Sequence, residues 1–463
     1  MISTTVFRRG AALLLGLTAV GVVPTVSNVS AAPATCAAES LCAGGEYFPV
    51  TPTRIFDQRG VDANGEVVVP VVGVNGIDGA PSGVPADGVL AVAVNVTIAG
   101  AAGNGFASVS PSDYVGGGDP TSLINFQYAG HTVPNFGIIG VGAQGEIKID
   151  LSTESAGSSR VIVDVFGFVA TSGFEGTDDA PLVDGARMVT VTPQRLYDSR
   201  EIGATLGAKQ SVEIPVRGRA GVPTDPDVTA VVVNLTGINN PSGNTGTYLT
   251  LTPEQVSSSL AEAPSSNGNY PSGVTKANLA IVPINDAGSI WLYNRGGRIN
   301  VALDVVAYLE TGADETSRTG RIVPLEAPFR SFDTREPEFG SAKLGFSSWE
   351  DWSFDDFAGS VQLNGAAIGE QAGLFGNLTA VALERLYATV PVRSFLTMNP
   401  ATPGEFPAGA PGNSNLNFTE GGAVANSSVV TYGDKDGDDN MVSTFNADGR
   451  THYFLDVYAV ILK

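Results

Sequence analysis

Short runs of alternating apolar and polar residues recur along the chain, separated by turns rich in Gly and Pro. Residues 91–97 read AVAVNVT and residues 161–166 read VIVDVF. Side chains two residues apart share one face of a β-strand, so this alternation is typical of strands in packed sheets. The pattern predicts an all-β protein of antiparallel sheets.

The same succession of predicted strands occurs three times. Each copy opens on Arg-x-x-Asp-x-Arg, passes through an aromatic-led strand ending in proline and a turn region with two asparagines, and closes on an apolar strand with one aspartate. The openings RIFDQR, RLYDSR and RSFDTR begin at Arg54, Arg195 and Arg330, 141 and 135 residues apart. A repeat of this length is a domain. The strand after each opening aligns Asn95 and Asn234 with Glu384 of the third copy.

The repeats predict three tandem antiparallel β-sandwich or jelly-roll-like domains of about 130 residues each. The expected division is signal peptide 1–34, N-terminal segment 35–46, repeat one 47–170, linker 171–186, repeat two 187–310, linker 311–319 and repeat three 320–463, with an aromatic and acidic insert at 345–360. The pattern does not fix the strand order. Independent beads and one compact body both remain open.

The first residues have the features of a secretory signal peptide. Arg8 and Arg9 precede an apolar run at 11–23, and small residues around Ala34 suit cleavage. Export predicts a small local disulfide between Cys36 and Cys42, with a lipid-anchored Cys36 as the alternative. No later segment contains about 18 consecutive apolar residues, so the sequence predicts no membrane span there. We therefore expect a secreted, extracellular or cell-surface protein.

The net charge narrows the range of partners. At −22, the chain would repel nucleic acid and anionic lipid. The expected partners are an extracellular glycan or cell-surface component, or other copies of the chain itself.

These motifs together resemble a repeat of exported actinobacterial proteins, written R-x-x-D-x-R, AVxxNxT and DVxGY. That repeat stands in tandem or is appended to secreted hydrolases. The resemblance covers residues 47–463 and implies an extracellular β-rich module of ill-defined function, with surface attachment as the expected role. The third copy departs most from the pattern, through Glu384 and the insert.

The repeated charged residues are expected to be structural. Asp164 lies between apolar neighbours on its strand, and a buried carboxylate needs a partner. Arg54 or Arg59 is expected to reach Asp164, with Asp57 completing the cluster, because guanidinium groups bind carboxylates in a fork. A binding site repeated three times is the alternative. The equivalent residues are Arg195, Asp198, Arg200 and Asp304 in the second copy and Arg330, Asp333, Arg335 and Asp456 in the third.

Four aromatic residues are the candidate ligand contacts. Trp291 and Tyr293 are expected on the outward face of their strand, where they suit stacking against sugars, and burial against a neighbouring copy is the alternative. Trp349 and Trp352 lie in the insert, where Ser347 and Glu350 have capping-box spacing and predict a short helical turn. A lid, a docking patch and a wedge between domains are open for this insert, and the wedge is favoured.

Metal binding and catalysis have weaker signals. Asp434, Asp436, Asp438 and Asp439 alternate around a glycine, which suits Ca²⁺ but also an acidic hairpin turn. No cofactor other than Ca²⁺ is indicated. His131 and His452, the only histidines, have no counterparts in the other copies, and no catalytic motif is present. Glu384 is the one candidate for a glycoside hydrolase carboxylate.

The sequence therefore predicts a secreted non-catalytic protein for glycan or cell-wall binding and surface attachment. The alternative is a structural subunit of an extracellular coat, filament or assembly. A glycoside hydrolase is the third reading, and the expected outcome is that the protein is not an enzyme.

Overall fold

The computed structural model describes most of the chain from residue 44 onward. The described residues are 44–116, 120–171, 174, 185–238, 246–257, 265–312, 317–354, 362–363, 366–367, 370–385, 393–404 and 406–463. The predicted signal peptide, Cys36 and Cys42 lie outside them, as do most of the two expected linkers and part of the insert.

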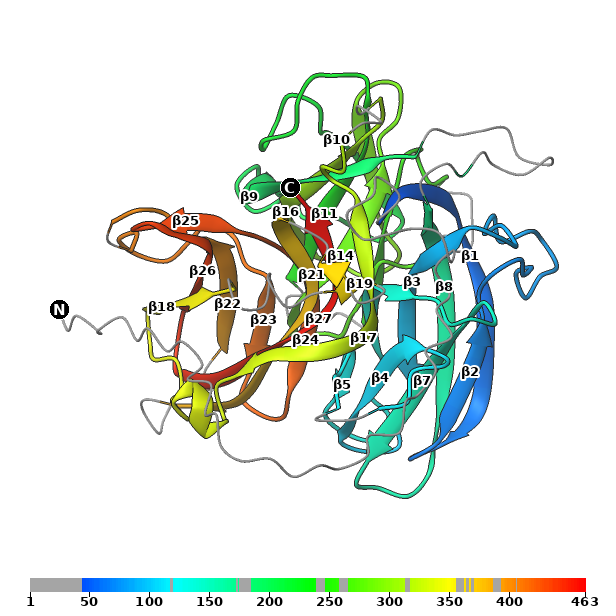
Figure 1. Ribbon diagram of the computed structural model, residues 1–463, viewed down its shortest axis with the longest axis horizontal. Helices are drawn as coiled ribbons and strands as arrows, with labels where there is room; N and C mark the ends of the chain where they lie inside the picture. Colours follow the sequence, from blue (N-terminus) through cyan, green and yellow to red (C-terminus); the bar gives the residue numbers. More distant parts are fainter. Residues whose placement is uncertain are drawn as a thin grey trace.

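The strands fall into three successive units that follow the repeats (Figure 1). The first unit holds β1 (Gly45–Asp62), β2 (Glu66–Pro70), β3 (Val89–Ala99), β4 (Gly105–Pro111), β5 (Ile124–Phe126), β6 (Val133–Gly140), β7 (Glu146–Thr153) and β8 (Ser158–Thr171). The second holds β9 (Arg187–Asp198), β10 (Gln210–Pro215), β11 (Val228–Ile238), β12 (Thr247–Thr252), β13 (Gly268–Tyr270), β14 (Thr275–Pro283), β15 (Ser289–Asn294) and β16 (Asn300–Glu310). The third holds β17 (Ile322–Asp333), β18 (Ser348–Ser353), β21 (Gln371–Glu384), β22 (Arg393–Pro400), β23 (Leu416–Thr419), β24 (Val424–Thr431), β26 (Asp438–Asn446) and β27 (Arg450–Leu462).

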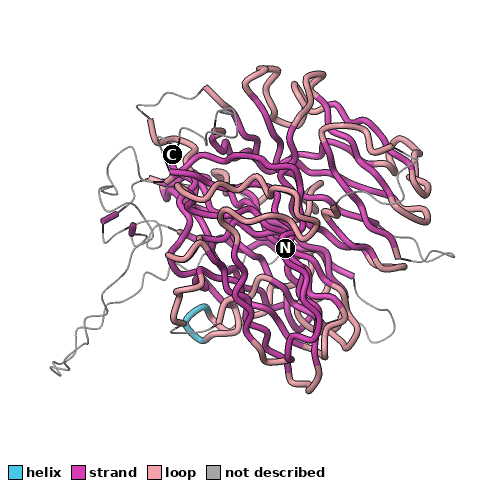
Figure 2. The backbone as a smooth tube through the Cα atoms, turned by 90° about the vertical axis from the view of Figure 1, so that its right-hand side faces the viewer, coloured by secondary structure: helices cyan, strands magenta, loops and turns pink. Residues whose placement is uncertain are grey.

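Few described elements lie outside this scheme. They are β19 (Gln362–Leu363) and β20 (Ala366–Ala367), which pair with each other, β25 (Gly433–Lys435) beside β26, and one 3₁₀ turn, η1 (Pro337–Phe339). That turn is the single helical segment in the described part of the chain (Figure 2). The prediction of an all-β fold is confirmed.

Each unit is a sandwich of two antiparallel sheets that share a four-strand order, and the inner sheets of the first and third units join through β1 and β17 into one eight-stranded sheet. In the first unit, β1-β8-β3-β6 form the inner sheet and β2-β7-β4-β5 the outer sheet. The second unit repeats this as β9-β16-β11-β14 and β10-β15-β12-β13, and the third as β17-β27-β21-β24 and β18-β26-β22-β23. Numbering the eight strands of a unit from one to eight, the orders 1-8-3-6 and 2-7-4-5 describe a jelly roll.

Burial along the strands explains two kinds of hydrophobic pattern. The outer strand β2 alternates exposed and buried residues, because one face of its sheet meets solvent. The inner strand β3 is buried at eight consecutive positions, because its sheet packs on the outer sheet at one face and on neighbouring units at the other. Inner sheets with two buried faces require the units to pack together, so the chain is one body rather than separate beads.

The units interlock through the connection between their fourth and fifth strands, called here the inserting loop (112–123, 253–267 and 401–415). Asn95 of the first unit donates to the carbonyl of Ser266 in the second unit's loop at 3.1 Å. Asn234 of the second unit donates to Ser414 of the third. Asn377 of the third donates to Ser122 of the first. The three contacts run in one direction and close a ring, as in a cyclic trimer.

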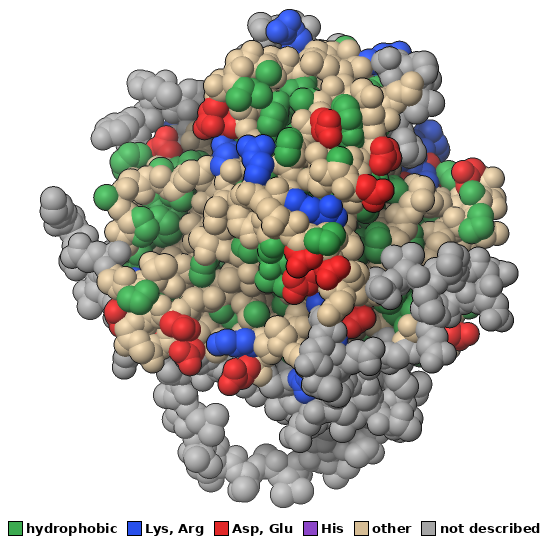
Figure 3. Space-filling model, turned by 90° about the horizontal axis from the view of Figure 1, so that it is seen from above, with side chains coloured by type: hydrophobic (Ala, Val, Ile, Leu, Met, Phe, Trp, Pro, Cys, Tyr) green, Lys and Arg blue, Asp and Glu red, His purple; other side chains and the backbone are tan. Residues whose placement is uncertain are grey.

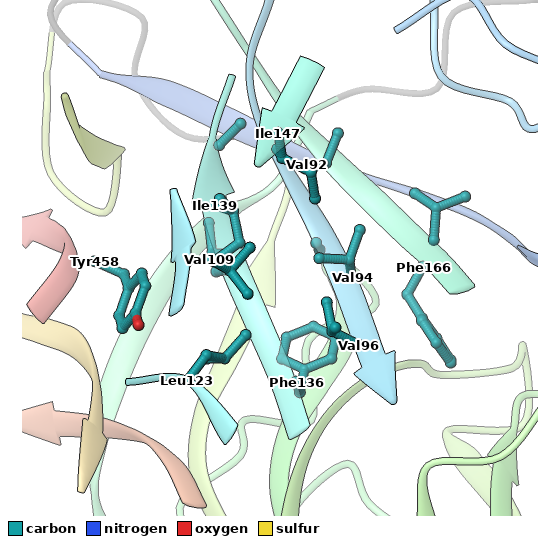
Figure 4. Close-up of a cluster of buried hydrophobic side chains, with 14 of the residues drawn as sticks. Val92, Val94, Val96, Val109, Leu123, Phe136, Ile139, Ile147, Phe166 and Tyr458 are labelled. Atoms are coloured by element: carbon teal, nitrogen blue, oxygen red, sulfur yellow. The ribbon is translucent and has the colours of Figure 1, made fainter. Parts of the chain in front are cut away.

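The edge strands and the strand starts complete the ring. The edge strands β6, β14 and β24 contact one another. Near the start of each opening strand, Tyr47 bonds to Ala186, Met188 donates to the carbonyl of Gly320, and Gly45 pairs with Ile322. Tyr458 of β27 belongs to the buried cluster of the first unit and is drawn with other members of it in Figure 4.

The ring corrects the alignment of the third copy. Asn377 pairs with Asp456 across the ladder, as Asn95 pairs with Asp164 and Asn234 with Asp304. The third copy therefore keeps its asparagine in GNLT at 376–379, and Glu384 lies at the far end of β21. The expectation that Glu384 replaces this asparagine was wrong, because AVALE at 380–384 resembles AVAVN in its hydrophobic pattern alone.

The described part of the expected insert is a regular strand. Ser348–Ser353 form β18, which pairs with β26 at the edge of the outer sheet. β18 takes the place that β2 and β10 take in the other units. The predicted helical turn and inter-domain wedge are wrong for these residues, because alternation in SWEDWS puts Trp352 toward the core and Trp349 on the other face.

Removal of one ring contact should destabilise the whole protein. Asn377 is fully buried and also accepts from Asn135 Nδ2 at 2.9 Å, so Asn377→Ala leaves buried polar groups of another unit without a partner. We expect a loss of about 1–3 kcal/mol in the free energy of unfolding, measured by urea denaturation. The exposed Asn104→Ala serves as the control. Equal stability of Asn377→Ala and wild type would show that the contact does not hold the ring.

Candidate functional site

The opening arginines and closing aspartates form the same ion pair in every unit. Arginine Nε lies 2.8 Å from Asp164 in the first unit, 2.5 Å from Asp304 in the second and 2.9 Å from Asp456 in the third. The aspartates are at most 2 % exposed. Of the two arginines considered for the first unit, Arg54 makes this pair and Arg59 is exposed.

In the second and third units, the same arginines and aspartates also bind the inserting loop of the next unit. Arg195 Nη2 donates to the carbonyl of Gly412 at 2.6 Å, and Arg330 Nη2 donates to that of Pro120 at 3.0 Å. The Ser122 amide donates to Asp456 at 2.8 Å, and the Ser414 amide donates to Asp304. The charged clusters therefore connect units as well as strands.

The middle aspartate of each opening string has its own arginine partner. Asp198 pairs with Arg200 at 2.6 Å, Asp333 pairs with Arg335, and Asp57 pairs with Arg160 in place of Arg59. The hydrogen bonds from Arg200 and Arg160 lower the pKa of Asp198 and Asp57. Burial acts to raise the pKa of Asp333, but Arg335 outweighs it and the net pKa is lowered. Burial raises the pKa of Asp304 and Asp456 despite their arginine partners.

A cleft of about 400 Å³ lies where the inserting loop of the third unit enters the second unit. From the second unit it is lined by Arg195, Asp198, Arg200, Glu201, Thr236, Ile238, Thr275 and Ala302, and from the third by Phe395, Pro411, Gly412, Asn413, Ser414 and Asn417.

A single small side chain explains why this junction is hollow. Ala302 lies two residues before Asp304, at the position held by Ile162 in the first unit and Phe454 in the third. In the third unit the ring of Phe454 lies under two guanidinium groups, with Arg330 Cζ at 3.9 Å and Arg335 Cζ at 4.9 Å from its centroid. The second unit keeps both arginines but has a methyl group in place of the ring.

A buried hydroxyl marks the same place. Thr236 pairs with Ala302 across the ladder, is 4 % exposed, and its Oγ1 has no hydrogen-bond partner within the described residues. The equivalent Thr379 Oγ1 shares this feature, but Thr379 pairs with Phe454, which occupies the space. Thr236 therefore places a buried hydroxyl in the wall of the cleft, beneath its solvent-accessible surface.

The two aromatic residues predicted on the outward face, Trp291 and Tyr293, differ in their exposure to solvent. Tyr293 is fully buried, so the expectation that it faces water was wrong. Its cross-strand neighbour Ser211 donates to the carbonyl of Val256, which brings the inserting loop of the second unit over this face. Trp291, two residues earlier, remains partly exposed.

The aromatic residues of β18 contact other parts of the third unit. Trp352 stacks on Phe332 with ring centroids 4.4 Å apart and donates from Nε1 to Tyr453 Oη at 2.5 Å. Trp349 stacks on Phe406 of the inserting loop at 5.8 Å. Both tryptophans are partly buried by these contacts.

The four aspartates proposed for Ca²⁺ lie on a hairpin. Asp436 and Gly437 have φ of 55° and 89° and form the turn between β25 and β26, as in a type I′ hairpin with Asp-Gly. Within the described residues, no three His, Cys, Asp or Glu side chains are close enough together to hold a metal ion. The carboxylates of Asp434, Asp438 and Asp439 therefore do not converge with that of Asp436.

The other candidate chemical groups lie apart from the cleft. Glu384 is half exposed and pairs with Lys343 at 2.5 Å and Arg450 at 3.4 Å. Lys343 lowers its pKa, which opposes a role as a general acid. His452 Nδ1 lies 3.2 Å from Thr334 Oγ1.

In the part of the chain that the structure describes, no helix is long and apolar enough to cross a membrane.

Sequence reasoning missed the residues that make the cleft. Ala302, Thr236 and Asn413 carry no conspicuous chemistry on their own. A column-by-column comparison of the closing strands would have shown Ile, Ala and Phe two residues before the common aspartate. That difference in volume was the available signal for Ala302.

Comparisons with known proteins identify no family. No protein-family model matches the chain, and no curated protein matches it. Among solved structures, the chain is similar to one described as "The Triple Jelly Roll Fold and Turret Assembly in an Archaeal Virus", at 7 % identity, a TM-score of 0.15 and coverage of 90 % of each chain. A TM-score this low does not establish a shared fold. The assignment of the jelly roll is based on the strand order alone.

The lowered pKa of Asp198 predicts part of the acid sensitivity. Its folded pKa lies below its unfolded value of about 3.9, so the carboxylate stabilises the fold above that pH and the contribution is lost as the pH falls through the folded pKa. Asp198→Asn should cost about 1–3 kcal/mol at pH 7 and show a shallower loss of stability below about pH 4 than wild type.

Urea denaturation at pH 7, 5, 4 and 3 measures this effect. The raised pKa of Asp456, which gives the opposite slope, is common to both proteins. The charge of Asp198 contributes to the raised pKa of Asp304, so the variant also lowers that pKa and the difference between the profiles reports both carboxylates. The exposed Asp434→Asn is the control for losing one carboxylate. Parallel pH profiles of Asp198→Asn and wild type would contradict the assignment.

Proposed function

We propose that the protein is an exported, non-catalytic saccharide-binding protein and that the cleft between the second and third units holds one end of a neutral glycan. The observation that carries the proposal is the place beside Ala302. There, two arginines lie beside a space that an apolar ring fills in the third unit.

The cleft combines the two kinds of contact that a sugar needs. A pyranose has an apolar C–H face that can take the place of the Phe454 ring under the guanidinium groups, and Phe395 supplies an aromatic wall. Its hydroxyls can pair with Thr275, Asn413 and Asn417. A volume of about 400 Å³ lies at the small end of ligand sites.

The charges at the cleft favour a neutral ligand. Arg195 and Arg200 are balanced by Asp304 and Asp198, and Glu201 at the rim adds one negative charge. Figure 3 shows acidic and basic side chains interspersed over one face of the molecule, with no extended basic region. An anionic saccharide would meet this rim charge and the net charge of −22.

A preformed site reduces the cost of binding. Each wall of the cleft belongs to a different unit, and the walls are joined by the bonds of Arg195 to Gly412 and of Asn234 to Ser414. Side chains held in place before binding lose little freedom when the ligand arrives. The partly exposed Trp291, on the outer sheet of the second unit, remains a separate predicted glycan contact.

A structural subunit of an extracellular assembly is the second candidate. The closed ring of three interlocked units favours it, because such a body is a rigid building block. In that case the purified chain would form large particles and the cleft would bind no saccharide.

Filling the cleft tests the proposal. In Ala302→Phe, the new ring should take the place that Phe454 takes in the third unit, so the fold is retained and saccharide binding is lost. Binding is measured by pull-down of residues 35–463 on insoluble polysaccharides and bacterial cell walls, and by calorimetry with soluble neutral oligosaccharides. Ala208→Phe, at an exposed position of the same unit, is the matched control.

The expected result is at least tenfold weaker binding by Ala302→Phe, with unchanged binding by Ala208→Phe and equal thermal stability of the two variants. No binding of any saccharide by wild type, with elution as large particles, would instead support the structural subunit. Equal binding by wild type and a folded Ala302→Phe would overturn the cleft as the site.

A further inference from the structure

An exposed tyrosine is held flat against a histidine at the end of the first unit. Tyr128 lies in the turn between β5 and β6 and is 54 % exposed. Its ring stacks on that of His131 with centroids 4.4 Å apart and an interplanar angle of 16°. Because the histidine covers one face of the tyrosine ring, the exposure falls on the other face and the edge.

Several hydrogen bonds fix this stack before any ligand arrives. The His131 amide donates to the carbonyl of Tyr128 at 3.1 Å, and the Gln127 amide donates to His131 Nδ1 at 3.2 Å. The amide of Ala101 donates to the carbonyl of His131 at 2.9 Å. The turn backbone and the histidine ring are therefore fixed, and the tyrosine ring is held by its stacking on that histidine.

The histidine under the tyrosine is uncharged at neutral pH. Burial, reinforced by the positive charge of Lys276, lowers the pKa of His131 to about 4. Lys276 belongs to the second unit and stands where the other units have Val133 and Val424. The stack thus presents a neutral aromatic surface with a phenol group at its edge.

The stack lies at the same end of the ring as the cleft. Lys276, which acts on His131, directly follows Thr275, which lines the cleft. Val274, the residue before, is 37 % exposed. Gln127 Nε2 donates to the carbonyl of Gly422 in the third unit at 3.3 Å, so the turns before β6 and β24 meet here, near Lys276 at the start of β14. Tyr128 and Val274 are two of seven exposed large hydrophobic residues in the described chain.

We propose that the Tyr128–His131 stack is a second saccharide subsite, which binds a further sugar unit of the glycan whose end lies in the cleft. The inference rests on the proposed function and extends it from one sugar unit to a chain that runs over Val274. The exposed face of Tyr128 stacks on the apolar face of a sugar ring, and its hydroxyl pairs with a sugar hydroxyl. The neutral stack suits the same uncharged glycan as the cleft.

The subsite predicts that affinity depends on chain length. The probes are neutral β-1,4-linked gluco-oligosaccharides and N-acetylglucosamine oligosaccharides of increasing length, measured by calorimetry with the full mature chain. Wild type should bind longer members more tightly than the single sugar. Tyr128→Ala should weaken binding of the longer members about five- to tenfold, as expected for loss of one aromatic contact, and should bind the single sugar like wild type.

A matched control separates this effect from the loss of any exposed aromatic residue. Phe346 is 55 % exposed and belongs to the third unit, and Phe346→Ala should bind every probe as wild type does. Tyr128→Phe, which keeps the ring, should retain most of the affinity for longer chains. His131→Ala should behave like Tyr128→Ala, because it removes the support of the ring.

The outcomes distinguish the two proposals. If wild type binds the probes in the cleft but Tyr128→Ala keeps the full dependence on chain length, the second subsite is wrong and the proposed function stands. If no probe binds wild type, the proposed function itself fails. A selective loss for long chains in Tyr128→Ala establishes the subsite.

Discussion

The fold depends on a carboxylate that is buried in the inner sheet of each unit and that, in the second and third units, also takes a hydrogen bond from the next unit. Asp304 and Asp456 are nearly inaccessible to solvent, and each is compensated by its own arginine and by a backbone amide from the next unit. A buried charge without such partners would cost several kcal/mol. The same face carries buried asparagines that also bond to the next unit. An isolated unit would leave these polar groups and an apolar sheet face exposed, so the three jelly rolls stabilise one another and stop at three because the ring closes.

Repetition and divergence have different consequences in this chain. Residues that recur in all three units, such as Arg195 and Asp304, form the ring and tolerate little change, because each has partners in two units. A substitution near these residues can leave their bonds intact and change only the volume beside them. Ala302 is such a substitution, because Thr236, Asp198 and both arginines keep their positions around it. The scaffold is therefore built from what the units share, and the candidate site from one position at which they differ.

Much of this could be predicted from sequence, and the rest could not for physical reasons. Strand alternation predicts the β-sandwiches, and isolated aspartates in apolar strands predict ion pairs with one of the two arginines of each opening string, because both depend on local chemistry. The sequence left open which arginine of each string makes the pair. The ring was not predictable from side-chain types, since the partners at Ser122 and Ser414 include backbone groups that every residue carries. Tyr293 was misplaced because alternation reveals which face of a sheet a residue shares but not that a loop covers that face. The signal for the packed inner faces was present in β3, whose apolar residues extend over both faces.

The conspicuous aromatic residues of the third unit illustrate why a site is hard to find by composition. Trp349 holds Phe406, and Lys435 lies over the same ring at 4.0 Å while pairing with Asp351. These contacts anchor the outer part of the loop whose far end, at Gly412 and Ser414, forms one wall of the cleft. The tryptophan therefore acts on the cleft through the position of the loop. Ala302, Thr236 and Tyr128 are inconspicuous in the sequence. They become candidate site residues only because the packing of the three units places them near one end of the ring. The proposed binding site lies where the interlocked units leave space, and that placement is a property of the assembled ring.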